Sequence, residues 1–129
     1  MTIVVGFIPN KFGQAALAAG ISEARLRGLK LVVVNATKGD AWVDTHFAST
    51  EQVSALEGEL AGLEAGYEVR QTDGPDIADQ IIKVVGETDA ALLVIGIRHR
   101  SAVGKMFMGS TAQTLILDCP CPILAVKAA

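Results

Sequence analysis

Five short apolar runs, separated by longer segments with helical periodicity, constrain most strongly what this chain can fold into. The runs span residues 2–8, 29–36, 67–72, 90–96 and 122–126. Most are continuous and rich in β-branched residues, which is typical of parallel strands covered on both faces. The run 67–72 alternates apolar and polar residues, so we place it at an edge of the sheet. Strands that alternate with helices predict a parallel α/β sheet.

The first two segments between these runs carry helix signals. Asn10 can cap a helix over 11–27, which Gly28 is placed to stop. Ser49 and Gln52 have the spacing of a capping box, and we expect the helix that they begin to end at Gly66. Its apolar stripe consists of Val53, Leu56, Leu60 and Leu63.

The later segments predict two more helices. Gly74-Pro75-Asp76 opens the first of them, and Pro75 suits its first turn. Its inward stripe consists of Ile77, Ile81, Val84 and Val85. The second precedes the last strand, and its predicted apolar face consists of Ala112, Leu115, Ile116 and Cys119.

Together these elements predict one Rossmann-like α/β domain over residues 1–129. Right-handed crossovers give a five-stranded parallel sheet in the order 3-2-1-4-5, with helices on both faces. Half of the residues are apolar and 19% are charged, which suits a compact domain and excludes disorder. In this strand order, ligands bind outside the carboxyl ends of the first and fourth strands. We therefore expect the site to lie among Ile8, Pro9 and Asn10 and the segment 96–110.

Composition excludes several classes of function. A net charge of −3 gives no overall attraction to nucleic acid or acidic membranes, and no apolar stretch is long enough to span a bilayer. The first residues, MTIVVGF, lack the basic start of a secretion signal, so we expect a cytoplasmic protein. Cys119 and Cys121 fit neither a redox pair nor a metal site, and we interpret them as buried packing residues.

The segment 96–113, GIRHRSAVGKMFMGSTAQ, gathers basic and hydroxyl side chains at the predicted site. Arg98, Arg100 and Lys105 can contact phosphate, or they can form an ordinary solvated surface. Gly109 allows a ligand to approach the backbone at a helix start, where unpaired N–H groups attract anions. Ser110 and Thr111 can donate hydrogen bonds to phosphate oxygens. Ser110 also has capping-box spacing to Gln113, which is a purely structural alternative.

No arrangement of side chains typical of catalysis accompanies this segment. Gly104-Lys105 is not the end of a P-loop, because Met106 stands where a magnesium-binding hydroxyl is required. No Ser-His-Asp or Cys-His set lies at one end of the predicted sheet, so we expect no enzyme beyond slow, incidental ATP hydrolysis. After the second strand, Trp42, His46 and Phe47 either stack on a base as a lid or pack beneath a loop with His46 exposed.

The segment GIRHRSAVGKMFMGSTAQTLILDCPCPILAVK, residues 96–127, resembles the C-terminal part of the universal stress protein family. Nucleotide-binding members of that family carry the motif G-2x-G-9x-G-[ST] after the fourth strand. The rest of the chain is similar in layout, with the fold of the adenine nucleotide alpha hydrolase-like proteins. By this resemblance, Gly96, Gly109, Ser110 and Thr111 cradle the ribose and phosphates. Ile95 then lies beside the base, and the backbone near Ala36 contacts adenine.

Two positions depart from the motif of the nucleotide-binding members. His99 replaces the second glycine, so an imidazole stands where backbone would approach phosphate; it is either a substitute donor or a solvated loop residue. Ile8 occupies the position of an acidic residue on the adenine side, which leaves backbone groups and apolar contact to hold a base.

The resemblance implies a regulatory protein that binds ATP or AMP, with or without Mg²⁺, in the crevice between the first and fourth strands. It also implies a homodimer formed by antiparallel pairing of the last strands, residues 122–127, because an uncovered apolar edge favours such pairing. Ile8 and His99 support an alternative, a homodimeric interaction module of the same fold that binds no nucleotide. A phosphoryl-accepting receiver domain is rejected, because GFIPN lacks clustered carboxylates.

Overall fold

The computed structural model describes residues 1–39, 44–97 and 109–128. The interpretations of Trp42, Arg98, His99, Arg100 and Lys105 therefore lie outside the described residues. None of the helices in the described part of the chain is long and apolar enough to cross a membrane.

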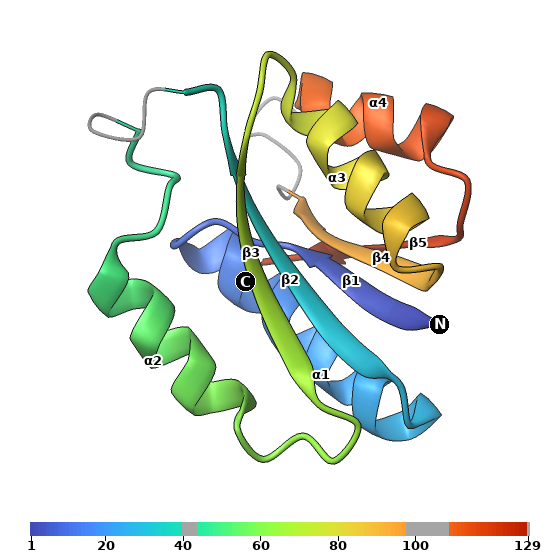
Figure 1. Cartoon of the computed structure of the whole chain (residues 1–129). Coiled ribbons are helices and arrows are strands. Elements are labelled where there is room, and N and C mark those ends of the chain that lie inside the picture. The colour runs from blue at the N-terminus through green and yellow to red at the C-terminus, as the bar shows by residue number, and fades with distance from the viewer. Residues whose placement is uncertain (40–43, 98–108, 129) are drawn as a thin grey trace.

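The strands form one parallel sheet in the order β3-β2-β1-β4-β5, as predicted (Figure 1). The strands are β1 (Thr2–Gly6), β2 (Lys30–Thr37), β3 (Tyr67–Asp73), β4 (Ala90–Ile97) and β5 (Ile123–Lys127). The helices between them are α1 (Lys11–Arg27), α2 (Thr50–Leu60), α3 (Ile77–Glu87) and α4 (Ser110–Asp118). The predicted order and the edge position of the third strand are confirmed.

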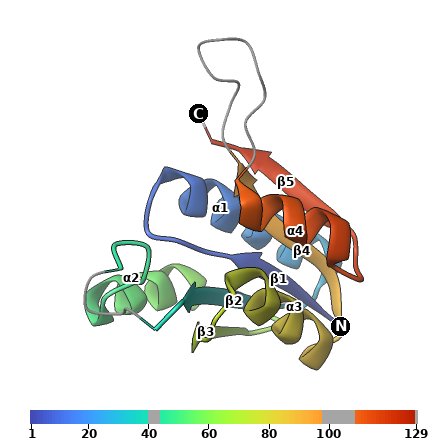
Figure 2. The same cartoon turned by 90° about the horizontal axis from the view of Figure 1, so that it is seen from above.

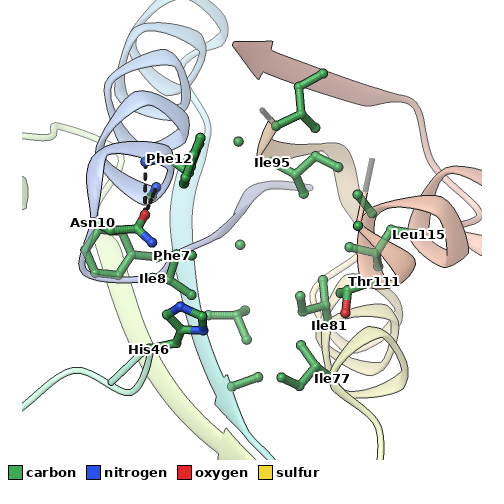
Figure 3. Close-up of a pocket in the computed structure, with 18 residues that line it drawn as sticks. Phe7, Ile8, Asn10, Phe12, His46, Ile77, Ile81, Ile95, Thr111 and Leu115 are labelled. Atoms are coloured by element: carbon green, nitrogen blue, oxygen red, sulfur yellow. Dashed lines mark hydrogen bonds between the residues drawn. The ribbon is translucent and has the colours of Figure 1, made fainter. Parts of the chain in front are cut away.

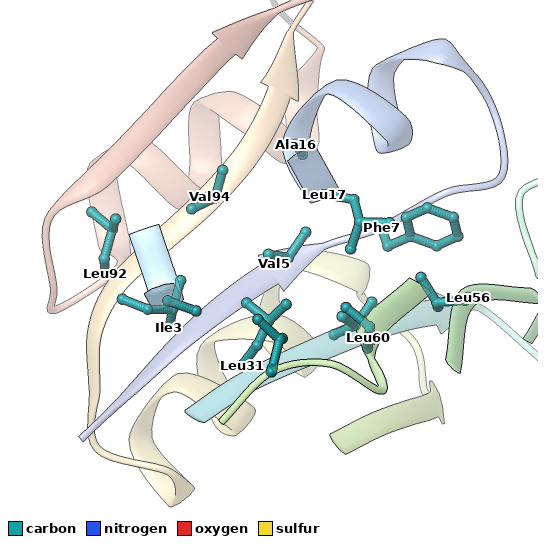
Figure 4. Packing of buried hydrophobic residues seen from close by; sticks show 13 residues of the cluster. Ile3, Val5, Phe7, Ala16, Leu17, Leu31, Leu56, Leu60, Leu92 and Val94 are labelled. Carbon is teal, nitrogen blue, oxygen red and sulfur yellow. The ribbon is translucent and has the colours of Figure 1, made fainter. Parts of the chain in front are cut away.

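Helices α1 and α2 cover one face of the sheet, and α3 and α4 cover the other (Figure 2). Successive strand side chains point to opposite faces, so each central strand contributes to two apolar clusters. On the α1 and α2 face, Ile3, Val5 and Leu31 pack with Leu17 and helix residues around it (Figure 4). The other cluster joins the intervening strand residues to α3 and α4. Burial on both faces explains why these strands read as continuous apolar runs.

Local capping signals predict several helix ends correctly. The Asn10 side chain accepts hydrogen bonds from the N–H groups of Phe12 and Gly13, at 2.9 and 3.1 Å. Gly28 ends α1 in the left-handed region, with φ of 64°. Ser49 and Gln52 exchange both hydrogen bonds of a capping box.

Other boundaries differ from the sequence prediction. Helix α2 ends at Leu60 rather than at Gly66, because the chain turns back after Leu60 and buries Leu63. Gly66, with φ of 89°, instead forms the turn into β3. Pro75 lies before α3 and not in its first turn, since the neighbouring Asp76 is the cap.

The predicted apolar face of α4 is also only partly correct. Leu115 is buried, but Ile116 is 43% exposed, because α4 presents only one side to the sheet and α3. Cys119 and Cys121 pack against the α3 and α4 cluster and are half-buried rather than buried, because they lie where the chain bends between α4 and β5.

Candidate functional site

A cavity of about 340 Å³ opens at the carboxyl ends of β1 and β4, the position that the strand order predicts (Figure 3). Its walls come from the loop after β1, the start of α1, the ends of β2 and β4, and the first turns of α3 and α4. The volume lies within the usual range for small-molecule sites, roughly 300–1,000 Å³.

The walls of this cavity are mainly apolar. Phe12 lies on one side of the cavity in Figure 3, and Ile77, Ile81 and Leu115 lie opposite it on α3 and α4. The polar side chains of the lining are those of Asn10, His46 and Thr111. Among its described residues, the lining contains no Lys, Arg, Asp or Glu. Such a surface suits the flat face of an aromatic ring and leaves charge recognition to helix ends and neighbouring loops.

A buried amide holds the wall formed by His46 in place. Asn35 is 1% exposed, and its side chain donates hydrogen bonds to the carbonyl oxygens of Phe7 and His46, at 2.9 and 2.8 Å. Its carbonyl oxygen accepts from the N–H of Ala48 at 2.7 Å and from Gln71 at 3.2 Å. One side chain therefore ties the loop after β1 to the segment after β2, which fixes two sides of the cavity.

Asp44 adds a second restraint on the same segment. The Thr37 hydroxyl donates to one carboxylate oxygen at 2.8 Å, and the N–H of His46 donates to the other at 2.9 Å. The Thr37 hydrogen bond is the main reason why the pKa of Asp44 lies below its usual value, and the hydrogen bond and charge of His46 act in the same direction. The His46 ring is exposed at the cavity rim, while its backbone is held from both sides.

Two glycines allow α1 to lie directly against the cavity floor. A Cβ atom on Gly13 would lie 1.7 Å from the carbonyl oxygen of Ile8, and one on Gly96 would lie 2.1 Å from that of Phe12. Both contacts are with backbone, which cannot rotate away as a side chain can. Gly96, which the family resemblance assigns to the ligand, thus also has a packing role in the protein itself.

Gly109 differs from these two glycines. A Cβ atom there would meet nothing within 4 Å, and its φ of −63° is open to any residue. It is the N-cap of α4, so the alternative in which Ser110 and Gln113 form a capping box is wrong, and Ser110 is instead the first helical residue. In the described structure no side chain caps α4, whereas α1, α2 and α3 are capped by Asn10, Ser49 and Asp76. The first N–H groups of a helix have no partner within the helix, and Gly109, Thr111 and Ala112 of this turn line the cavity.

The structure brings together eight of the residues that the sequence analysis considered for the site. The cavity lining includes Ile8, Asn10, Ala36, His46, Ile95, Gly96, Gly109 and Thr111. Pro9 and Ser110 lie next to it but do not line it. The candidates Arg98, His99, Arg100, Lys105 and Trp42 lie outside the described residues.

Sequence reasoning missed several wall residues. Ile77 and Ile81 read as ordinary core residues of an amphipathic helix, although the first turn of α3 also faces the cavity. Phe12 carries no signal beyond its place after a helix cap. The signal that could have identified Ile77 is its position as the first residue of α3, because this helix begins at the end of the sheet where the cavity opens.

The described residues contain no group of three or more His, Cys, Asp or Glu side chains placed to hold a metal ion. The site therefore shows no metal centre within this part of the chain.

Comparison with known proteins gives the family. The sequence matches the model of the universal stress protein family over residues 1–127. The chain belongs to this family. It is 48% identical over 125 residues to a universal stress protein of Mycolicibacterium smegmatis, a match that covers 97% of this chain and 96% of the relative. The resemblance noted in residues 96–127 is thereby confirmed.

Solved structures of the family share the fold. A universal stress protein from Archaeoglobus fulgidus superposes with a TM-score of 0.82 at 30% identity, over 98% of each chain. A universal stress protein from the same organism, in complex with dAMP, gives a TM-score of 0.66 at 25% identity, again over 98% of each chain.

Proposed function

We propose that this universal stress protein binds an adenine nucleotide, AMP or ATP, in the cavity between β1 and β4, and that its role is regulatory rather than catalytic. The observation that carries the proposal is the cavity itself, which has apolar walls among the described residues and the first turn of α4 at its edge, where no described side chain caps the helix. The dAMP complex of the A. fulgidus protein supports the choice of ligand.

The described residues fit the parts of a nucleotide in different ways. The base packs between apolar side chains, with Ile95 and Ile8 beside it and the backbone at Ala36 within its reach. The open space at Gly109 accepts the sugar and phosphate, and the N–H groups of the first turn of α4 attract the negative charge. Ser110 and Thr111 supply hydroxyl donors at the same turn.

Further phosphate contacts come from the segment 98–108, where Arg98, His99 and Arg100 provide cationic or hydrogen-bonding groups. Mg²⁺ accompanies ATP in this proposal as an ion held by the phosphates, since the described residues offer no metal centre. The protein acts in the cytoplasm, and the bound nucleotide is read out by a partner.

Isothermal titration with AMP and ATP, each with and without Mg²⁺, tests the proposal. Saturable binding on the order of micromolar is expected. Gly109→Asp should abolish it, because the new carboxylate repels phosphate. Aspartate is also a favourable N-cap, so this variant should fold at least as stably as the parent chain.

Gly58→Asp is the matched control, since Gly58 is an exposed helical glycine of α2 outside the cavity lining, with nothing near its Cβ position. It should bind nucleotide like the parent chain. Equal loss of binding in both variants would contradict the site. No binding up to millimolar nucleotide would favour the alternative, a dimeric interaction module, for which the apolar Ile8 in the cavity wall is the supporting observation.

We also propose a homodimer formed through residues 122–127. Strand β5 is at an edge of the sheet, and its residues Ile123, Leu124 and Val126 are only partly buried. Antiparallel pairing of two such edges would cover them. Ala125→Asp should shift the protein to monomer in sedimentation velocity, because like charges would then face each other across the two-fold axis. A dimer unaffected by this change would place the interface elsewhere.

A further inference from the structure

The two cysteines of the chain lie together at the far end of α4 from the cavity. Cys119 is the C-cap of α4, and Cys121 comes two residues before β5, in the connection between α4 and β5 in Figure 1. Their sulfur atoms are 3.6 Å apart, and both residues are half-buried. The pair is therefore reachable from solvent and close enough to act on one ligand atom.

The backbone is anchored on both sides of this pair. The N–H of Cys119 donates to the carbonyl oxygen of Leu115 at 2.9 Å, and the N–H of Leu93 in β4 donates to that of Pro122 at 3.0 Å. Both cysteines also pack against the apolar cluster beneath α3 and α4. The one residue between them is Pro120, whose ring restricts the backbone. The spacing of the sulfur atoms is therefore largely set by the fold.

The two reduced sulfur atoms, 3.6 Å apart, are close enough to bind one central atom together. Two sulfur atoms held about 2.3 Å from one soft central atom, and 3.6 Å from each other, subtend an angle of about 100° there. A linear two-coordinate ion would need them roughly 4.6 Å apart. The pair thus fits a pyramidal or tetrahedral centre.

The residues around the two cysteines indicate which kind of central atom they can bind. Within the described ranges, no third His, Cys, Asp or Glu joins the two cysteines to make a metal-binding group. A zinc ion, which uses three or four protein ligands, is therefore poorly matched. A trivalent centre that already carries its own third substituent needs only two protein ligands.

The protonation state of the Cys121 thiol also favours a trivalent metalloid over a simple metal cation. Burial, together with the neighbouring Cys119, raises the pKa of the Cys121 thiol to about 11. A simple cation would have to displace the thiol proton at neutral pH, which lowers its affinity. A metalloid hydroxide avoids this loss, because its own hydroxyl groups take up the protons and leave as water.

We propose that Cys119 and Cys121 form a dithiol site for trivalent oxyarsenicals, which is separate from the nucleotide cavity. In the reaction, two S–H and two As–OH bonds break, two As–S bonds form, and two water molecules leave. Arsenic remains trivalent and both sulfur atoms keep their oxidation state, so no oxidant or reductant takes part.

Phenylarsine oxide, which hydrates to a dihydroxide, is the probe. The reduced full-length chain should take up one phenylarsenic group in intact-mass measurements, and both thiols should become resistant to alkylation. Excess glutathione, a monothiol, should not reverse the adduct, whereas 2,3-dimercaptopropanol should. Two arsenic groups per chain, or ready reversal by glutathione, would overturn the proposal.

Cys119→Ala and Cys121→Ala test whether both thiols are needed, and alanine keeps the site small and apolar. Each should lower the affinity about 100-fold or more, because the second of two linked bonds then no longer forms. The parent chain unfolded in urea is the matched control for the fold, since it keeps both cysteines without their fixed spacing.

The unfolded chain should bind roughly 10-fold or more weakly, because it must order the pair first. Equal affinity of folded and unfolded chain, or unchanged affinity in either variant, contradicts the site. Treatment with a hydroperoxide then tests whether the two cysteines form a disulfide with each other. An intramolecular disulfide in a chain that takes up no arsenical would mark the pair as a redox site instead.

Discussion

Gly96 and Gly109 belong to the same family motif, yet the structure predicts opposite effects when alanine replaces them. A Cβ atom on Gly96 would lie 2.1, 2.7 and 3.1 Å from the carbonyl oxygen, carbonyl carbon and Cα of Phe12. All three are backbone atoms, so the start of α1 must move away from β4. Overpacking of this kind destabilises by about 1–3 kcal/mol, and backbone contacts this short place Gly96→Ala near 3 kcal/mol.

Gly109→Ala should leave the stability nearly unchanged. A Cβ atom there meets nothing within 4 Å, and φ of −63° suits alanine. Alanine is a poorer N-cap than glycine, but it also reduces the entropy of the unfolded chain by about 0.4–1 kcal/mol, and the two effects oppose each other.

Urea denaturation and thermal unfolding of the two variants measure the difference. For a chain of this size, 1 kcal/mol changes Tm by about 4 °C, so Gly96→Ala should lose about 12 °C and Gly109→Ala should stay within about 2 °C. Equal Tm values for both variants would refute the packing explanation for Gly96. Strong destabilisation by Gly109→Ala alone would reverse the assignment of the two roles.

Three further changes test other parts of the molecule. Asn35→Ala should lower the free energy of unfolding by about 3 kcal/mol or more and speed hydrogen exchange at the N–H of Ala48, because buried partners lose their hydrogen bonds. Thr37→Val should raise the pKa of Asp44 in an NMR titration, since the main group that lowers it is removed. In the parent chain, the folded-state pKa of Asp44 lies below the unfolded value, so its stabilisation is present above about pH 4 and is lost as the pH falls through the folded pKa; Thr37→Val should weaken this acid dependence. Alkylation of Cys121 by iodoacetamide in Cys119→Ala should remain slow at pH 8 and accelerate at higher pH, because burial is the main cause of its raised pKa; a rate equal to that of a free thiol would contradict that burial.

Much of the fold follows from signals within a few residues of one another. The strand order and the edge position of β3 were predicted from continuous and alternating apolar patterns, and Asn10, Gly28 and Ser49 mark helix ends through local hydrogen bonds. The predictions that failed depend on distant packing. Leu63 continues the helical apolar pattern of α2, yet the chain reverses before it, because the sheet offers a buried place for that side chain.

The candidate site was predictable in position but only partly in composition. Topology places it at the ends of β1 and β4, and family resemblance adds Ala36, Ile95 and Thr111. Ile77 and His46 reach the cavity from segments on either side of β3. Nothing in the local sequence of Ile77 distinguishes it from a core residue, and for His46 the sequence left open a lid over a base or an exposed position in a loop.

The order of apolar and polar residues along the chain accounts for the class of fold, because strands covered on both faces and amphipathic helices have few other ways to bury their surfaces. It also accounts for the end of the sheet at which a ligand can bind. The detailed shape of the cavity depends instead on contacts between segments that are distant in the sequence. The network of Asn35 shapes the cavity wall, and the backbone of Phe12 makes Gly96 necessary. These features depend on distances in space, which periodicity along a sequence does not encode.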